Sequence, residues 1–353
     1  MLPRGKPYGS ILYPEKGCNY MKIMDILAIF RNLAPEQNQS SWDNSGVQIA
    51  GSVSDVSHVA VCLEPTPDML ARCLEWGAGV VITHHPLYMK PKGLGRESSF
   101  LDVVRQVVKS GAWLYAAHTS LDTRPNGPAF WLGDSLKLEN RKLLEVEHGV
   151  TPIEVSFYSE EPISRETADI WANNDGMHSV SQSNTGEIRL VCDESAWGEI
   201  AGGIEFSMGR KPVFYTRQLT GPRDEVGFGE VGVLPEPMPW NDFADKLGGL
   251  IDRDAFTVSG PRPETVEKVA YCGGSGTTLV GHAARAGADV FITGDMKYHP
   301  AVEADVCVAD VGHFSLEEEM MRLFADELAG ALDGAEVKFF KGEDPFRFHV
   351  VNR

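Results

Sequence analysis

Residues 77–86 read GAGVVITHHP, and residues 287–300 read GADVFITGDMKYHP. In both segments a glycine precedes a short run of β-branched and apolar residues, which is typical of a buried strand. The first run ends in two adjacent histidines, His84 and His85. Open α/β sheets place their chemistry at the carboxyl ends of their strands, so we expect these histidines to lie at a functional edge.

The similarity between the two segments extends over a larger unit. Strand-like runs that end near Cys62 and Cys272 precede the segments, and fifteen residues separate each cysteine from the following Gly77 or Gly287. This spacing predicts a strand, helix, strand unit in both places. The sequence therefore predicts an α/β fold with two similar lobes, copies of one unit, related by a pseudo-twofold axis.

A histidine with a carboxylate four residues later follows each unit. His118 precedes Asp122 in HTSLD, and His313 precedes Glu317 in HFSLE. One such pair arises readily by chance, but two pairs at equivalent positions are much harder to dismiss. The pairs therefore favour a shared chemical role.

Ser315 and Glu318 have the S-x-x-E spacing of a capping box. This spacing predicts a helix that begins near Leu316. His313 would then lie just before the helix and Glu317 in its first turn, so that both side chains point toward one spot.

Packing of the two lobes would bring the carboxyl ends of their strands to a shared cleft and gather six polar side chains. These are His84, His85, His118, Asp122, His313 and Glu317. Imidazole and carboxylate donors suit zinc, iron or manganese, and five or six donors favour two divalent ions over one. A lone histidine at a strand end is more often a hydrogen-bonded structural group, so the metal interpretation depends on the repeated pairs.

Further candidates lie directly after the second apolar segment. Asp295 and His299 could supply acid or base groups to the same cleft, and Lys297 could contact the substrate. A turn that starts a helix explains these residues equally well.

The run CGGSGTT at residues 272–278 lies between a predicted strand and a predicted helix. Free backbone amides in such a loop can hold a phosphate, and Gly274, Ser275 and Gly276 form its centre. The run has neither the GxGxxG pattern nor the P-loop lysine spacing. A tight turn that needs glycine is therefore an equal explanation.

The composition bounds the classes of protein to be considered. A chain of 353 residues exceeds the usual size of one domain, so two or three packed units are expected. The 32 basic and 50 acidic side chains give a formal net charge of -18 at pH 7. This charge would repel a phosphate backbone, so direct nucleic-acid binding is not expected.

The cysteine pattern and the first residues of the chain bear on the cellular compartment of the protein. Six cysteines are scattered without a CxxC pair, which favours a reducing cytoplasm. No apolar run approaches the roughly 18 residues of a membrane span, and the first twenty residues lack the apolar block of a signal peptide. Because an amphipathic helix begins only at Met21, residues 1–20 are expected to be a disordered extension or the product of an overlong translation start.

Seven motifs, in this order along the chain, resemble those of one known family. They are SWDNSGVQIAG (41–51), ITHHPLYMKPKG (82–93), HTSLD (118–122), GGSGTT (273–278), TGDMKYH (293–299), GHFSLEE (312–318) and DPFRF (344–348). The family is the Nif-three-like family of dinuclear-metal-centre hexameric proteins, often labelled GTP cyclohydrolase 1 type 2 homologues. The resemblance covers nearly all of residues 21–353 except a central segment.

The resemblance implies a pair of similar α/β lobes, a toroidal homohexamer and two metal ions in the cleft. The ligands that it suggests are His84, His85, Asp122, His313 and Glu317, with His118 close by. The central segment resembles the small α+β, ferredoxin-like insert of longer family members, which is similar to the PII proteins. We therefore expect an extension at 1–20, a first lobe at 21–148, an insert at 149–222 and a second lobe at 223–353.

The activity that the family label implies is hydrolytic ring opening of a purine nucleotide such as GTP. In this interpretation His118, Asp295 or His299 moves protons, and the glycine-rich run or Lys297 holds phosphate. Two alternatives stay open, namely a two-metal phosphoesterase and a non-catalytic metal-binding ring that serves as an adaptor for protein partners.

Overall fold

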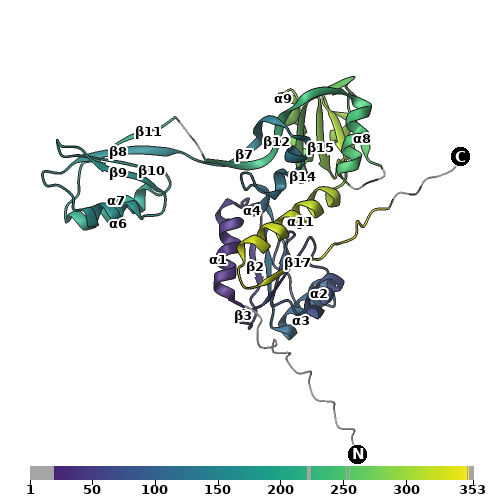
Figure 1. Cartoon of the computed structure of the whole chain (residues 1–353), viewed down its shortest axis with the longest axis horizontal. Helices are drawn as coiled ribbons and strands as arrows, with labels where there is room; N and C mark the ends of the chain where they lie inside the picture. The colour runs from purple at the N-terminus through teal and green to yellow at the C-terminus, as the bar shows by residue number, and fades with distance from the viewer. Residues whose placement is uncertain (1–19, 221–223, 252, 254, 348, 350–353) are drawn as a thin grey trace, which may run out of the picture. The chain divides into compact units, whose positions relative to one another are not determined.

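The computed structural model describes residues 20–220, 224–251, 253, 255–347 and 349. It divides into two compact units, one formed by the segments up to Glu145 and from Phe228, and the other by Val146–Gly227 (Figure 1). Apart from Tyr20, the expected extension at residues 1–20 lies outside the described residues, and so does the expected boundary at residue 222.

A five-stranded sheet of the larger unit carries the first histidine segment. Its spatial order is β17-β4-β5-β6-β2, in which β4, β5 and β6 run parallel, β17 is parallel to β4, and β2 is antiparallel to β6. The strands are β2 (Gly46–Ile49), β4 (His58–Cys62), β5 (Val80–Thr83), β6 (Trp113–Ala116) and β17 (Glu336–Phe339).

Helices cover both faces of this sheet. The helices α2 (Pro67–Glu75) and α3 (Ser99–Ser110) pack on one face, and α1 (Ile23–Leu33) and α11 (His313–Ala331) pack on the other. All four residues of β5 are buried. Burial on both faces explains why this strand is continuously apolar instead of alternating.

A six-stranded sheet carries the second segment in the order β13-β16-β15-β14-β12-β7, with β14, β15 and β16 parallel. The helices α8 and α9 cover opposite faces of this sheet. The elements are β7 (Glu139–Val150), β12 (Asp224–Pro239), α8 (Trp240–Leu250), β13 (Thr257–Ser259), β14 (Thr265–Ser275), α9 (Val280–Arg285), β15 (Val290–Gly294) and β16 (Cys307–Asp310).

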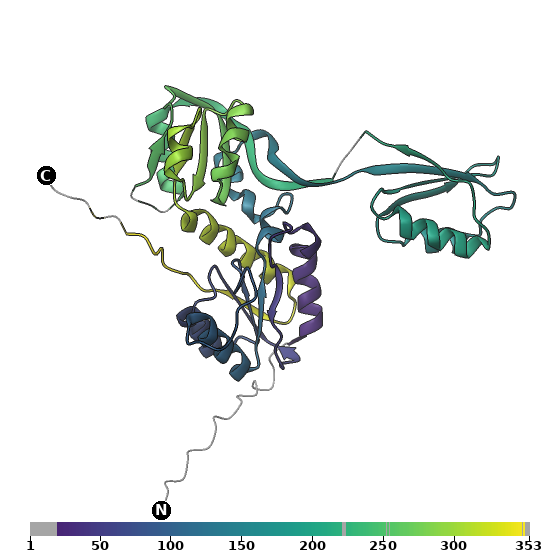
Figure 2. The same ribbon diagram turned by 180° about the vertical axis from the view of Figure 1, so that it is seen from behind.

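The long helix α11 connects the two sheets. Both ribbon views show it running between them, and it contacts β4 and β17 of the first sheet and β14 and β15 of the second (Figures 1 and 2). Its buried residues Met320 and Phe324 belong to one apolar core that also contains Ile82 and Ile292. The two sheets therefore share a core, which fixes the distance between their functional edges.

The start of α11 differs from the sequence prediction. The helix begins at His313, three residues earlier than predicted, because Ser315 does not cap it. The Ser315 hydroxyl instead donates to the carbonyl oxygens of Val311 and Gly312 at 2.6 and 3.0 Å. Glu318 accepts a hydrogen bond from the Gly342 backbone amide at 2.6 Å. The predicted capping box is therefore wrong.

The strand β17 also differs from the expected division into lobes. The sequence predicts that residues 223–353 lie wholly in the second lobe, whereas β17 pairs with β4 of the first sheet. The register joins Val337 with Val59 and Phe339 with Val61. The chain after α11 thus returns to the first sheet and covers its edge.

The smaller unit contains a four-stranded antiparallel sheet with the order β11-β8-β10-β9. Phe157 and Trp171 are fully buried in its own core. Its elements are β8 (Pro152–Tyr158), α6 (Arg165–Ala172), β9 (Met177–Gln182), β10 (Glu187–Asp193), α7 (Trp197–Met208) and β11 (Tyr215–Gln218).

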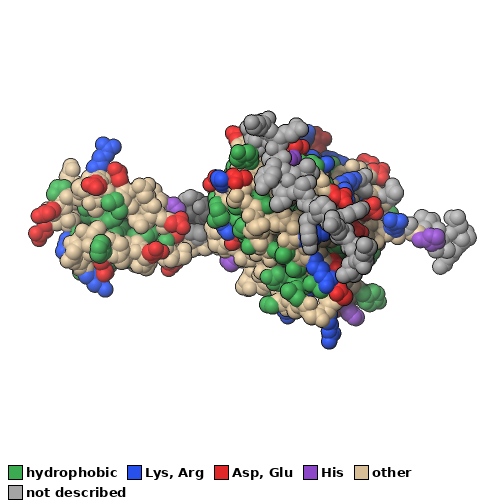
Figure 3. Space-filling model, turned by 90° about the horizontal axis from the view of Figure 1, so that it is seen from below, with side chains coloured by type: hydrophobic (Ala, Val, Ile, Leu, Met, Phe, Trp, Pro, Cys, Tyr) green, Lys and Arg blue, Asp and Glu red, His purple; other side chains and the backbone are tan. Residues whose placement is uncertain are grey.

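The remaining elements are short and lie mainly near the sheet edges. They are β1 (Met21–Lys22), η1 (Glu36–Asn38), β3 (Asp55–Val56), α4 (Thr119–Asp122), η2 (Pro128–Phe130), α5 (Trp131–Leu136), η3 (Thr277–Leu279) and α10 (Tyr298–Val302). Within the described part of the chain, no helix combines the length and the apolar character that crossing a membrane requires. Acidic and basic side chains are interspersed over the face seen in Figure 3.

Candidate metal centre

The six side chains that the sequence predicts to converge come from three places in the larger unit. His84 and His85 directly follow β5. His118 directly precedes the helix α4, and Asp122 is the last residue of that helix. His313 and Glu317 lie one turn apart in α11. The His84 Nε2 atom lies 3.7 Å from Asp122 Oδ1 and 3.6 Å from Glu317 Oε1. The structure thus brings residues more than 200 positions apart to one spot.

The donor atoms form two overlapping groups of three. Within each group the ligand atoms lie within 4.8 Å of one another. The first group contains His84, His85 and His118, and the second contains His85, His313 and Glu317. In the second group, Glu317 Oε2 lies 2.8 Å from His313 Nε2 and 3.1 Å from His85 Nε2. Because His85 belongs to both groups, the donors form one continuous cluster.

Each of the four imidazoles has its Nδ1 atom beside an oxygen acceptor. A neutral imidazole that donates from Nδ1 leaves Nε2 without a proton, and Nε2 can then accept a metal or a proton. Metal-binding histidines usually make such a bond, which fixes the ring orientation. The four pairs are His84 with the Ala117 carbonyl at 2.9 Å, His85 with Glu64 at 2.6 Å, His118 with Asp43 at 2.7 Å and His313 with Asp295 at 2.8 Å.

The Nε2 atom of His84 tests whether the cluster fits a cation. The His84 side chain is fully buried, and its Nε2 atom has no hydrogen-bond partner among the described residues. Buried polar atoms nearly always have a partner, so a buried nitrogen that faces two carboxylates points to a missing ligand. The donor set of imidazoles and carboxylates fits zinc, iron or manganese.

Three of the imidazoles, those of His84, His85 and His313, hold protons tightly when no metal occupies the cluster. Burial acts against the charged form, but the carboxylates outweigh it, so the pKa of His84 is raised by Asp122 and Glu317. In the same way, Glu317 and Glu64 raise the pKa of His85 to about 10, against the effect of burial. Glu317 and Asp295 likewise raise the pKa of His313 to about 9. Metal binding must therefore displace protons from these rings.

The two carboxylates of the cluster respond in opposite directions. Burial would raise the pKa of Glu317, but His84, His313 and His85 outweigh it and hold the pKa well below its usual range. Burial raises the pKa of Asp122, and the nearby charge of Glu317 adds to this effect against the pull of His84. Glu317 is therefore the carboxylate that stays ionised at the centre of the cluster.

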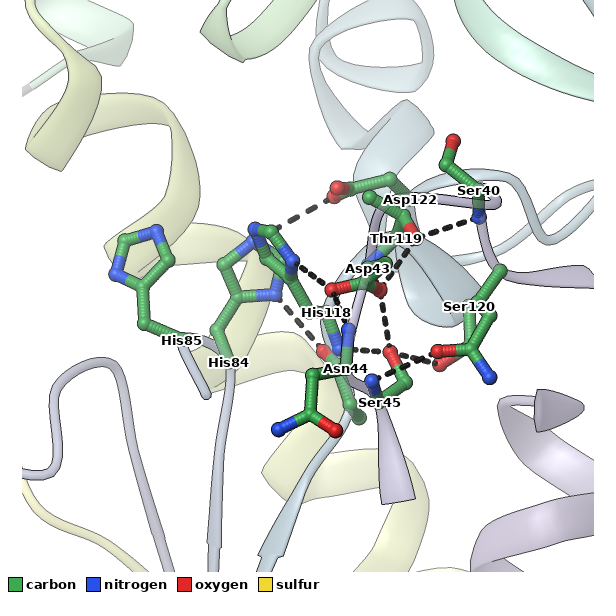
Figure 4. Close-up of polar contacts among 12 residues, drawn as sticks. Ser40, Asp43, Asn44, Ser45, His84, His85, His118, Thr119, Ser120 and Asp122 are labelled. Atoms are coloured by element: carbon green, nitrogen blue, oxygen red, sulfur yellow. Dashed lines mark hydrogen bonds and ion pairs between the residues drawn. The ribbon is translucent and has the colours of Figure 1, made fainter. Parts of the chain in front are cut away.

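Asp43 lies beside the cluster but was not predicted from the sequence. Its carboxylate accepts hydrogen bonds from the ring of His118 and from the hydroxyl of Ser45, at 2.7 Å in both cases (Figure 4). It also accepts from the Thr119 backbone amide at 3.1 Å. Burial acts to raise the pKa of Asp43, but the ring of His118 and the hydroxyls of Thr119 and Ser45 hold the pKa well below its usual range. Asp43 belongs to the SWDNSG motif, but the contacts of the individual residues of this motif could not be assigned without the fold.

Glu64 was also missed. It comes two residues after the end of β4, and thus at the same sheet edge as the histidines. The rule that places functional groups at the carboxyl ends of parallel strands would have included it. Its hydrogen bond to His85 lowers its own pKa, although burial acts in the opposite direction.

The structure separates the three residues expected after β15. Asp295 lies at the cluster with a positive φ of 56° and contacts His313. Lys297 and His299 are exposed at the start of α10, and His299 packs against the ring of Tyr298. No described contact joins Lys297 or His299 to the six-residue cluster.

The first half of the glycine-rich run belongs to a strand and not to a loop. The strand β14 continues to Ser275, and the Gly276 amide donates to the Thr293 hydroxyl at 2.8 Å. Gly274 has a positive φ of 61°, and a Cβ atom there would collide with Glu317 Oε1. Glycine is therefore needed at 274 because the backbone passes directly against the Glu317 carboxylate.

We expect Gly274→Ala to destabilise the fold by about 1–3 kcal/mol and to reduce metal content, because it forces φ strain and displaces Glu317. The matched control is Gly273→Ala, since a Cβ atom at Gly273 meets no heavy atom within 4 Å among the described residues. Chemical denaturation and metal analysis of the two variants check this. Equal stability and metal content in both would contradict the packing argument.

Comparison with known proteins places the chain in a family. Residues 21–345 match the family described as Duf34/NIF3 (NGG1p interacting factor 3). A Staphylococcus epidermidis protein named GTP cyclohydrolase 1 type 2 homolog is 24% identical over 363 residues, which cover 94% of this chain and 97% of that protein. A Halalkalibacterium halodurans protein of the same name is 24% identical over 372 residues, which cover 93% of this chain and 100% of that protein.

Solved structures of related proteins have a similar fold. A Bacillus cereus protein related to NIF3 has a TM-score of 0.77 at 23% identity, covering 94% of this chain and 100% of that one. A hypothetical protein of Staphylococcus aureus has a TM-score of 0.78 at 23% identity, and the match covers 93% of this chain and 99% of that one. The mixed α/β fold with several sheets therefore matches NIF3-related structures, and the resemblance seen in the sequence is confirmed. Because the family match spans most of its length, the chain belongs to the Duf34/NIF3 family.

Proposed function

We propose that the six-residue cluster binds two divalent metal ions and that the protein is a metal-dependent hydrolase. One observation carries the proposal: all four imidazoles have an oxygen acceptor at Nδ1, which frees their Nε2 atoms for a common centre that also contains Asp122 and Glu317. Structural histidines at a surface have no reason to share this arrangement.

The proposed ligands are His84, His85, Asp122, His313 and Glu317. When bound, zinc, iron or manganese ions act as Lewis acids and supply a water of lowered pKa. Two ions would be supported by the number of donors, because the two donor groups together contain more ligand atoms than one ion needs. The chain's own contribution is to fix the rings through Ala117, Glu64 and Asp295 before any ligand arrives.

We propose that His118 moves protons during the reaction. Asp43 holds a proton at His118 Nδ1, so the opposite nitrogen is free to accept one from the substrate or from water. The carboxylate also stabilises the ring once it is charged, which is the usual purpose of an acid beside a basic histidine. The donor geometry fits a ligand role for His118 as well, and metal analysis of His118→Ala separates the two roles.

The reaction that we propose is hydrolytic opening of a purine ring, as the name of the curated relatives suggests. Asp295 is placed to assist because it borders the cluster. Roles for His299 in proton transfer and for Gly274, Ser275, Gly276 and Lys297 in holding phosphate stay predictions.

We also propose that the two sheets arose as copies of one unit. The parallel strands β4, β5 and β6 correspond to β14, β15 and β16. After both β6 and β16 comes a histidine, followed four residues later by a carboxylate on a helix. The smaller unit has the strand and helix order of a ferredoxin-like fold, which supports the expected insert. The toroidal hexamer stays a prediction.

The decisive experiment combines metal analysis with product analysis. Purified protein is loaded with manganese, zinc or iron, its metal content is measured, and it is incubated with GTP or with guanosine beside a metal-free control. Formate released only by the loaded protein is the expected result. Release of phosphate alone would favour the phosphoesterase alternative, and a protein that takes up no metal would end the proposal.

A further inference from the structure

A cavity opens directly beside the metal cluster. It has a volume of about 500 Å³, which is within the range of small-molecule sites, and both His85 and His313 line it. Glu64 and Asp295, the carboxylates that hold these two rings, also face it. A molecule in this cavity therefore touches the cluster at one end.

Apolar side chains form the opposite walls. Leu63 and Met69 come from the first sheet and its helix α2, Phe314 comes from the first turn of α11, and Phe346 comes from the segment after β17. Phe346 is 72% exposed. An exposed aromatic ring in the lining of a cavity offers apolar surface that a bound molecule can cover.

The charged residues that line the cavity are all acidic, apart from the imidazoles. They are Glu64, Asp295 and Glu343, and no lysine or arginine is among the described residues of the lining. Of the neighbouring arginines, Arg253 pairs with Asp344. Arg347 lies 3.7 Å from Glu343, but both of these side chains are almost fully exposed, so solvent screens the pair. Away from the metal cluster, the walls of the cavity therefore offer a negative charge no partner and disfavour a negatively charged group.

We propose that this cavity binds the non-reacting part of the substrate, and that this part is a compact ring compound without negative charge. The ring packs between Met69, Phe314 and Phe346, while its hydrogen-bond donors face Glu64 and Asp295. This inference rests on the proposed hydrolase function for what happens at the cluster. Among purine substrates, it favours a base or nucleoside over the triphosphate.

Three probes of similar size separate charge from shape, namely benzamidine (cationic), benzamide (neutral) and benzenesulfonate (anionic). Each is titrated into the metal-loaded full chain labelled with ¹³C-methyl methionine, and the Met69 signal, assigned with Met69→Leu, reports binding. We expect benzamidine and benzamide to shift this signal and benzamidine to bind about tenfold more tightly than benzenesulfonate. Phe346→Ala should weaken both binding probes.

Glu343→Lys tests the charge argument, because its exposed carboxylate lies outside the proposed metal ligands. The variant should narrow the difference between benzamidine and benzenesulfonate at least threefold, and Glu236→Lys, at an exposed position outside the cavity, should leave it unchanged. Tighter binding of benzenesulfonate, or no binding of any probe at millimolar concentration, would overturn the inference. Metal content is measured on the same samples, so failure of the metal proposal is seen separately.

Discussion

Replacement of Glu317 by glutamine will remove tight metal binding. The Glu317 carboxylate lies within 3.6 Å of imidazole nitrogens of three histidines of the cluster, and its lowered pKa keeps it ionised at neutral pH. An amide of the same shape has no charge to offer a cation. We expect metal affinity to fall by about 100-fold or more, measured by competition with a chelator of known affinity.

The same helix provides the control. Glu319 is two residues further on, where its carboxylate pairs with Arg322 at 2.7 Å and is about one third exposed. Glu319→Gln changes the same chemical group and should leave metal affinity within about a factor of two, because an exposed pair contributes little. If the two variants lost metal equally, the cluster would not be the binding site.

The second large effect concerns pH, and its sign differs between the metal-free and the metal-loaded protein. In the metal-free protein the pKa values of His85 and His313 are raised to about 10 and about 9. Their stabilising protons are fully present below the unfolded value of about 6.5 and are lost as the pH rises through 9 to 10. Metal-free protein therefore loses stability across this window.

Metal binding has the opposite dependence, because it must displace those protons and becomes easier as they leave. The increase in melting temperature caused by metal should therefore be larger at pH 8.5 than at pH 6.5. Thermal unfolding with and without a chelator at the two pH values measures it, and Glu317→Gln, which should show no increase at either pH, is the control. An increase that does not change with pH would contradict the protonated state of the cluster.

The convergence of six side chains could be predicted because it depends on order along the chain. Parallel strands must have their carboxyl ends at one edge, so His84 and His118 had to lie near each other once the strands were recognised. The link to His313 needed the repeat, because no local pattern connects two segments so far apart. The role of these residues as ligands stays a prediction.

The partners of the imidazoles could not be predicted in the same way. Asp43 and Glu64 act through the directions of their side chains, which depend on χ angles and on packing and leave no periodic trace in the sequence. The helix start at His313 was missed for a related reason. The Ser315 hydroxyl can cap a helix or bond back to a carbonyl of the preceding turn, and only the fold decides between them.

The return of β17 to the edge of β4 has a consequence for synthesis. The first sheet consists of strands made early, yet its outer strand is translated more than 200 residues after β6. At 5–20 residues per second the ribosome needs roughly 10–40 seconds for that distance, during which the edge of β4 is open to other chains. The first sheet therefore cannot gain this outer strand until most of the chain has been synthesised.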